Sequence, residues 1–300
     1  MNFSAVLTQY CNLSCQHCYL PSRAMAAKKA DDLEWVVCRE AFRTQGEQLS
    51  DVVEELYLTG GEFLTLSYGE QVVSLARECF PRSKIFVYTN GLLFLEDPGL
   101  FGRVVPDVFH VGLDTWHGGI DRDGRAPVAD RFLEYREGGG AAALIFHWTR
   151  KDGDEETYQA FHRRYQGRDV EIEDRSLNTT TGRARAFDTP RYRQDEVWRP
   201  CDFGEHVLLK YDGQCYACHY ALPISIIGRI TDTGLRRRME QLRGSPLGQV
   251  MHGPDSGAFY RRVCCRYGLE FCPNRCLLCE TFHNHRIDLS EAARSWLAGS

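Results

Sequence analysis

Three cysteines stand close together near the start of the chain, in the stretch Cys11-Asn12-Leu13-Ser14-Cys15-Gln16-His17-Cys18. This C-x3-C-x2-C spacing places three thiolates on one loop, directly after a short apolar run. Three thiolates can hold three irons of a 4Fe–4S cube, whereas a cluster that only transfers electrons is normally held by four cysteines. The spacing therefore predicts a cluster with one iron open to another ligand. A zinc knuckle short of one ligand, or cysteines scattered in a core, are the alternative interpretations.

Composition excludes several classes of protein. The 300 residues are 43% hydrophobic, enough to bury the core of one large domain, alone or with a smaller appendage. A net charge of −5 argues against a nucleic-acid partner, because proteins that bind nucleic acid carry a basic surface. The apolar runs are too short to span a membrane, and Met1-Asn2-Phe3 leads into the first predicted strand without a signal peptide. We therefore expect a cytoplasmic protein with no membrane partner.

Thirteen cysteines in a cytoplasmic chain do not indicate disulfides, because that compartment keeps thiols reduced. Their distribution is uneven: three lie in the first loop, Cys38 and Cys79 stand alone, and eight fall between Cys201 and Cys279. Two separate groups of this kind indicate metal binding. The two isolated cysteines lie on predicted helices and are expected to be small buried residues.

Short apolar segments alternate with helical patterns before the second cysteine group. Strands are predicted over residues 3–8, 55–59, 84–89, 109–113, 141–148 and 170–172. Helices are predicted between them, most clearly over residues 31–49, 67–80 and 154–165. This alternation predicts right-handed βαβ units and a parallel sheet. Six units are too few to close an eight-stranded barrel.

The first cysteine group resembles the signature of the radical SAM enzymes, in which the amine and carboxylate of S-adenosylmethionine chelate the open iron. The resemblance implies an α/β fold, a partial (β/α)6 TIM barrel, with the 4Fe–4S cluster and S-adenosylmethionine at the C-terminal strand ends. It also implies reductive cleavage of that cofactor to a 5′-deoxyadenosyl radical, which takes hydrogen from a substrate carbon. A flavodoxin- or ferredoxin-type protein is the expected electron donor.

Motifs at the predicted strand ends support this resemblance. Gly60-Gly61-Glu62 resembles the family's GGE segment, whose glycines let backbone approach the methionyl group. Thr89-Asn90-Gly91 matches a frequent TNG turn. Val111-Gly112-Leu113-Asp114 resembles a segment that often reads Ser-Leu-Asp, with Gly112 at the serine position. The GGE and TNG segments can also be read as turns that end a strand.

Arginines complete the expected cofactor site. Arg122 or Arg125 could neutralise the methionyl carboxylate, and a solvated loop arginine is the alternative for either one. Arg183 belongs to a Gly-Arg-Ala segment that often closes the core domain in one branch of the family. The cofactor-binding residues implied by the resemblance are Gly60, Gly61, Glu62, Thr89, Asn90, Asp114, Arg125 and Arg183.

The later cysteines resemble the SPASM extension of peptide-modifying radical SAM enzymes, which carries two auxiliary 4Fe–4S clusters. The match is good for C-x11-G-x4-C from Cys201 to Cys218, whereas the adjacent pair Cys264-Cys265 departs from the family's spacing. One or two auxiliary clusters are therefore expected. A structural zinc on Cys215-x2-Cys218 and Cys276-x2-Cys279 is the alternative. The expected metal ligands are Cys11, Cys15 and Cys18 at the first cluster, and Cys201, Cys215, Cys218, Cys264, Cys265, Cys272, Cys276 and Cys279 at the auxiliary clusters.

His219 directly follows Cys218, where the sulfatase-maturing relatives carry an aspartate thought to take a proton from the substrate. A histidine can do the same near neutral pH, so His219 is the candidate catalytic base. A hydrogen bond from His219 to cluster sulfur is the alternative. The resemblance divides the chain into a radical SAM domain over residues 1–190, a SPASM-like domain over residues 191–285, and a tail over residues 286–300.

These features predict a radical SAM oxidoreductase that makes an oxidative or crosslinking modification in a ribosomally made peptide or protein. Tailoring of a small metabolite is the first alternative. An iron–sulfur electron carrier or zinc-ribbon protein without catalysis is the second. Because the chain begins at its first predicted strand, we expect any leader-peptide-binding protein to be a separate partner.

Overall fold

The first strand of the chain lies inside the sheet rather than at its edge. In the computed structural model, β1 (Asn2–Val6) lies between β4 (Glu55–Thr59) and β9 (His206–Lys210) and runs parallel to both. The structure describes residues 1–18, 20, 23–24, 32–117, 119–150, 153–175, 201, 203–218, 223–271 and 275–299.

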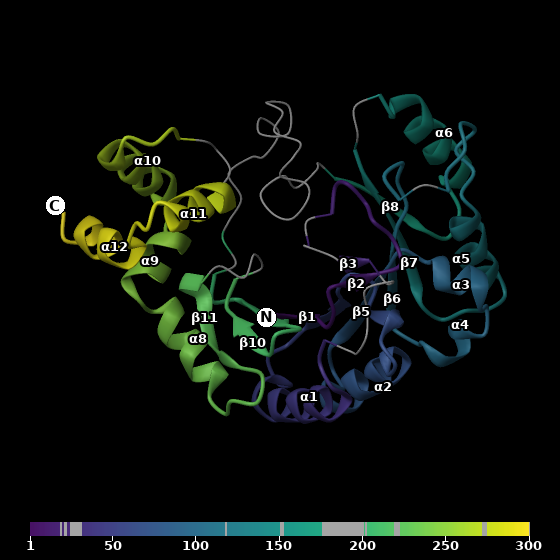
Figure 1. Ribbon diagram of the computed structural model, residues 1–300, viewed down its shortest axis with the longest axis horizontal. Coiled ribbons are helices and arrows are strands. Elements are labelled where there is room, and N and C mark those ends of the chain that lie inside the picture. The colour runs from purple at the N-terminus through teal and green to yellow at the C-terminus, as the bar shows by residue number, and fades with distance from the viewer. Residues whose placement is uncertain are drawn as a thin grey trace.

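From β1 the sheet continues through parallel strands in chain order: β4, β5 (Lys84–Thr89), β6 (Val108–Gly112), β7 (Ala143–Thr149) and β8 (Glu171–Arg175). The helices that connect them are α1 (Trp35–Leu49), α2 (Gly69–Cys79), α3 (Leu92–Glu96), α4 (Leu100–Arg103), α5 (Pro127–Glu137) and α6 (Glu155–Tyr165). Figure 1 shows these helices along the outer side of the curved sheet. The predicted α/β fold with a mostly parallel sheet is confirmed.

Alternate residues of each strand face the helices, as the two-residue period of a strand requires. Phe3 of β1 packs against Phe42 of α1 and Phe80 beyond α2, with ring centroids 6.2 Å and 5.4 Å away. The strand residues that alternate with the helix-facing ones point to the inner side of the curved sheet. On β6 and β7 these include His110 and His147. The sheet therefore has an apolar outer face and, at this end, a polar inner one.

Three strands after residue 200 extend the sheet and were not predicted. β10 (Gln214–Tyr216) pairs antiparallel with β9, and β11 (Ile226–Arg229) pairs antiparallel with β10. On its other side β9 pairs parallel with β1, near the opposite end of the chain. No local pattern in His206–Lys210 reveals that pairing. The sheet thus continues across the predicted boundary after residue 190, and the division into domains stays a prediction.

The C-terminal helices are α8 (Leu235–Arg243), α9 (Pro246–His252), α10 (Ser256–Tyr267), α11 (Arg275–Asn284) and α12 (Leu289–Leu297). The last four enclose a second hydrophobic core, whereas the buried Leu235 and Met239 of α8 belong to the first. This second core includes Leu247, Phe259 and Phe282, and it is distinct from the core between the sheet and α1–α6. Within the described ranges, no helix combines the length and apolar character needed to cross a membrane.

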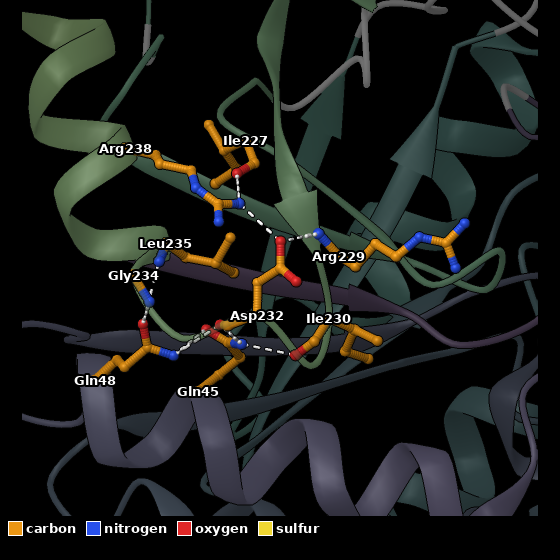
Figure 2. Close-up of polar contacts among 9 residues, drawn as sticks. All are labelled: Gln45, Gln48, Ile227, Arg229, Ile230, Asp232, Gly234, Leu235 and Arg238. Atoms are coloured by element: carbon orange, nitrogen blue, oxygen red, sulfur yellow. Dashed lines mark hydrogen bonds and ion pairs between the residues drawn. The ribbon is translucent and has the colours of Figure 1, made fainter.

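Two glutamines of α1 hold the turn between β11 and α8 (Figure 2). Gln45 Nε2 donates to the carbonyl oxygen of Ile230 at 2.7 Å, and Gln48 Nε2 donates to that of Asp232 at 3.0 Å. The Gln48 Oε1 atom accepts from the first amides of α8, at Gly234 and Leu235. These bonds attach β11 and α8 to α1, a helix that packs on the parallel sheet.

Candidate active site

The three N-terminal cysteines lie on the loop that leaves β1. Cys11 belongs to β2 (Tyr10–Cys11), which pairs with β3 (Arg23–Ala24), and Cys15 and Cys18 follow in the next turn. All three thiols are partly exposed. The Leu13 amide donates to Cys11 Sγ at 3.4 Å, so the loop already directs a donor at this sulfur.

Gly60 and Gly61 lie against the base of the cysteine loop. A Cβ atom on Gly61 would stand 2.1 Å from the carbonyl oxygen of Tyr10, so only glycine fits there. The Gly61 amide donates to the Thr8 carbonyl, and the Glu62 amide donates to the Tyr10 carbonyl, each at 2.8 Å. The GGE segment therefore supports the loop that carries Cys11 through backbone contacts.

The Glu62 carboxylate is 1% exposed and joins the ends of β4 and β5. Its Oε2 atom accepts from the Thr89 hydroxyl at 2.8 Å and from the Asn90 amide at 2.9 Å. Burial raises the pKa of Glu62 to about 7, although these donors oppose the rise. The Asn90 side chain in turn donates to Asn12 Oδ1 at 2.6 Å and lies 3.8 Å from Cys11 Sγ.

Asp114 follows β6 and is fully buried. It accepts from the backbone amide of His117 at 3.0 Å and from the ring Nδ1 of the same residue at 2.8 Å. The other carboxylate oxygen accepts from the Thr149 amide at 3.3 Å and lies 3.8 Å from His17 Nε2. His17 stands between Cys15 and Cys18, so Asp114 faces the cysteine loop.

His117 is a site residue that the sequence interpretation missed. Burial alone would lower its pKa, but the charge and hydrogen bond of Asp114 raise that pKa to about 10, and a hydrogen bond with Cys15 adds to the rise. A Cβ atom on Gly112 would lie 3.0 Å from His117 Cε1. The signal in the sequence was Gly112 itself, where the family often carries serine.

Arg125 does not join this group. It lies on an exposed turn, and its Nε atom is 3.4 Å from Asp130 Oδ2 on α5. The same turn packs on α6, because Gly124 comes close to the backbone of Phe161. Three predicted residues, Arg183, His219 and Cys272, lie outside the described residues.

Several later cysteines gather in the second core. Cys218, Cys264 and Cys279 are buried there, and Cys201 packs against them at its edge. The Tyr260 hydroxyl and Cys279 Sγ share a hydrogen bond of 2.8 Å. Three of these cysteines thus belong to one small core, and a fourth lies at its edge.

Two predicted auxiliary ligands lie elsewhere, and a third is partly exposed. Cys215 points from β10 into the core of the parallel sheet, where burial raises its pKa to about 12. Cys265 is exposed on α10, although its neighbour Cys264 is buried. Cys276 is partly exposed on α11. The zinc alternative needs Cys215 and Cys218 side by side, and the structure assigns them to different cores.

The N-terminal donor set suits an iron–sulfur cluster. Burial raises the pKa of the metal-free Cys11 thiol to about 11, so its thiolate needs a bound cation. Amide donors from Leu13 and Asn90 approach the same sulfur, and such outer contacts tune clusters of this type. Three thiols on one loop fit three irons and leave a fourth for another ligand.

Comparison with known proteins agrees with this geometry. Residues 5–134 match the model of the radical SAM superfamily. The sporulation killing factor maturation protein SkfB of Bacillus subtilis (strain 168) is 26% identical over 115 residues, which make up 37% of this chain and 26% of SkfB. The match thus spans about a quarter of that relative.

Solved structures share the fold. A histidine-tagged form of anSMEcpe with bound AdoMet has a TM-score of 0.55 at 13% identity, covering 81% of this chain and 77% of that one. The native form with bound AdoMet has a TM-score of 0.54 at 13% identity, covering 80% of each. The matched residues 5–134 hold the cysteine loop, the GGE segment and Asp114. Over these residues the chain matches the radical SAM superfamily.

Proposed function

We propose that this radical SAM enzyme makes an oxidative or crosslinking modification in a ribosomally made peptide or protein. The name of the curated relative, a maturation protein for a sporulation killing factor, supports a gene-encoded substrate. The group formed by Cys11, Asn90 and Glu62 at the strand ends is the observation that supports the chemistry.

The chain's own residues have distinct parts in this proposal. Cys11, Cys15 and Cys18 would hold the 4Fe–4S cluster. Together with S-adenosylmethionine, that cluster supplies, when bound, a 5′-deoxyadenosyl radical that removes hydrogen from an unactivated carbon. Glu62 positions Asn90 through its amide, and Asn90 donates toward Cys11.

The other predicted site residues support the groups around the cysteine loop. Gly60 and Gly61 keep the backbone close beneath the cysteine loop. Thr89 holds the Glu62 carboxylate in place. Asp114 fixes the ring of His117 beside Cys15. His219 stays the predicted proton acceptor.

We further propose one auxiliary 4Fe–4S cluster, bound in the second core. Cys201, Cys218, Cys264 and Cys279 share that core, whereas Cys215 and Cys265 lie away from it. One cube needs four thiolates, and the second core supplies them without either outlier. When bound there, the cube would supply an acceptor for the one electron that a substrate radical releases as it is oxidised. We expect a flavodoxin- or ferredoxin-type electron donor and a cytoplasmic location.

The test of the chemistry uses protein reconstituted anaerobically and reduced with dithionite. Wild type should convert S-adenosylmethionine to 5′-deoxyadenosine, and the triple variant with Cys11, Cys15 and Cys18 changed to Ala should not. Cys79→Ala, which removes a thiol outside both groups, is the control and should retain the activity. If the triple variant still produced 5′-deoxyadenosine, the assignment of these three cysteines as ligands of the 4Fe–4S cluster would be wrong.

The test of the substrate uses short peptides encoded by the neighbouring genes. Mass spectrometry should show loss of a hydrogen pair from the peptide, dependent on S-adenosylmethionine and on Cys11. Turnover of a small metabolite, with the peptide unchanged, would favour the metabolite alternative. The two experiments are independent, since cleavage of S-adenosylmethionine can be measured without substrate.

A further inference from the structure

The inner side of the sheet carries an unexpected polar cluster. Strands β6, β7 and β8 are neighbours, and they present His110, His147 and Glu173 to the same side. The side chains that alternate with them, such as Phe109 and Phe146, pack against helices. Polar groups removed from water are costly unless they are paired, so two histidines and a carboxylate on this face need an explanation.

The three side chains converge on one point. His110 Nε2 lies 3.2 Å from Glu173 Oε2, and His147 Nδ1 lies 3.8 Å from the same oxygen. One ligand atom from each residue lies within 4.8 Å of the other two. Imidazole and carboxylate ligands bind zinc at about 2.0–2.2 Å, which places two ligands of one ion roughly 3–3.5 Å apart. The two separations from Glu173 Oε2, 3.2 Å and 3.8 Å, are close to that spacing before any ion is added.

Outer contacts orient both rings. His147 Nε2 lies 3.2 Å from the Thr149 hydroxyl, which leaves its Nδ1 directed toward Glu173. The ring of His110 stacks on Tyr88, with centroids 4.1 Å apart and planes 19° from parallel. A histidine that binds a metal normally makes a hydrogen bond through its other ring nitrogen, which fixes the tautomer and the ring position. His147 meets that requirement.

We propose that His110, His147 and Glu173 bind one divalent transition-metal ion on the inner side of the sheet. Two imidazoles and one carboxylate suit Mn²⁺, Fe²⁺ or Zn²⁺, and three protein ligands leave coordination positions open. The carbonyl, hydroxyl or carboxylate oxygen of a bound substrate is the class of group that such an ion takes up.

Hydrogen bonds connect the proposed metal site to the cysteine loop. The Thr149 hydroxyl contacts His147, while its backbone amide donates to Asp114. Asp114 in turn holds His117 beside Cys15. Thr149 thus links the metal site to Asp114, which faces the cysteine loop. It goes beyond the proposed function, because the ion would bind whether or not a peptide is the substrate.

The test measures binding of Mn²⁺ by the fully reconstituted enzyme, whose oxidised 4Fe–4S clusters give no EPR signal. Mn²⁺ is the probe because thiolates prefer softer ions, and the reconstituted clusters occupy the cysteines. Loss of the EPR signal of free Mn²⁺ should show one ion bound per chain, and pulsed EPR should show nitrogen coupling from histidine. Glu173→Gln and His110→Gln should each weaken binding at least about tenfold, and Thr149→Val should weaken it less.

Glu171→Gln is the matched control, because it makes the same change two residues earlier on β8 and should leave the affinity unaltered. Iron content and thermal unfolding of each variant show that it has folded. Wild type that binds no Mn²⁺ would overturn the proposal. Equal binding by wild type, Glu173→Gln and His110→Gln would also overturn it. Failure of the peptide assay would not, since this measurement needs no substrate.

Discussion

Gly112 lies directly against the imidazole of His117, where a Cβ atom on residue 112 would stand 3.0 Å from Cε1. The absence of a side chain lets the ring reach both Asp114 and Cys15. The glycine that departs from the family's frequent serine is therefore paired with a histidine beside a cluster ligand. The two positions should be energetically coupled.

Gly112→Ala should destabilise the wild-type protein more than it destabilises a His117→Ala background, because the new methyl group meets the ring only when the ring is present. The coupling energy between neighbours of this kind is about 0.5–3 kcal/mol. Urea unfolding of cluster-free wild type, the two single variants and the double variant measures this coupling energy. Additive effects of the two substitutions would contradict the contact.

Gly61→Ala should prevent assembly of the N-terminal cluster. The new Cβ atom would stand 2.1 Å from a backbone carbonyl oxygen, that of Tyr10, which cannot move without displacing Cys11. Overpacking of this kind typically costs about 1–3 kcal/mol. Iron content and the EPR signal of the reduced cluster provide the measurement. Gly102→Ala is the control, because nothing lies within 4 Å of its Cβ position. A normal cluster in Gly61→Ala would contradict the structure.

Glu62 should make the stability of the cluster-free protein fall as the pH rises. Its folded pKa of about 7 exceeds the ordinary value of 4.5, so the folded state holds the proton more tightly. The free energy of unfolding should therefore decrease between about pH 4.5 and pH 7, by on the order of 2–3 kcal/mol. His117 is charged near this carboxylate throughout that range, and Cys11 is a neutral thiol there; both titrate at higher pH.

Urea unfolding at pH 5, 6 and 7 measures this slope, and Glu62→Gln should flatten it. Glu54→Gln, which changes an exposed glutamate, should leave the slope as in wild type. Parallel curves for wild type and Glu62→Gln would show that this carboxyl group does not titrate in the range.

Reconstituted wild-type protein should contain about eight irons per chain, four in each of two cubes. Cys264→Ala should reduce this by about half, because Cys264 lies in the second core. Cys215→Ala should retain the full content, since Cys215 packs in the core of the parallel sheet. About twelve irons in wild type, together with a loss in Cys215→Ala, would indicate two auxiliary clusters.

Gln45→Leu should loosen the C-terminal elements from α1. The substitution removes the donor to the Ile230 carbonyl and leaves a buried acceptor unsatisfied, at a cost of about 1–3 kcal/mol. Hydrogen exchange should become faster in β11 and α8. Gln71→Leu, at an exposed position of α2, is the control for the change in helix propensity. Unchanged exchange in Gln45→Leu would mean that other contacts hold this region.

Local pattern determined much of this protein. Strands β1, β4, β5, β6 and β7 were predictable because each is a short, largely apolar run followed by turn residues. The prediction over residues 170–172 only overlaps β8, whose sequence EIEDR is mostly charged. The carboxyl ends of parallel strands meet at one edge of a sheet. For that reason the cysteine loop, Glu62 and Asn90 come together as their positions at the strand ends indicate.

Only the tertiary structure decided the rest, because it depends on contacts between distant segments. Strand β9 joins the sheet through β1, and no pattern near His206 reveals that partner. The spacing Cys215-x2-Cys218 suggested a shared ligand pair, yet Cys215 faces one core from β10 while Cys218, just beyond the strand, enters the other. The ring of His117 reaches Cys15 because Gly112 leaves room for it, and burial beside Asp114 sets its charge. Which side of a strand a residue faces, and what lies there, is settled by packing.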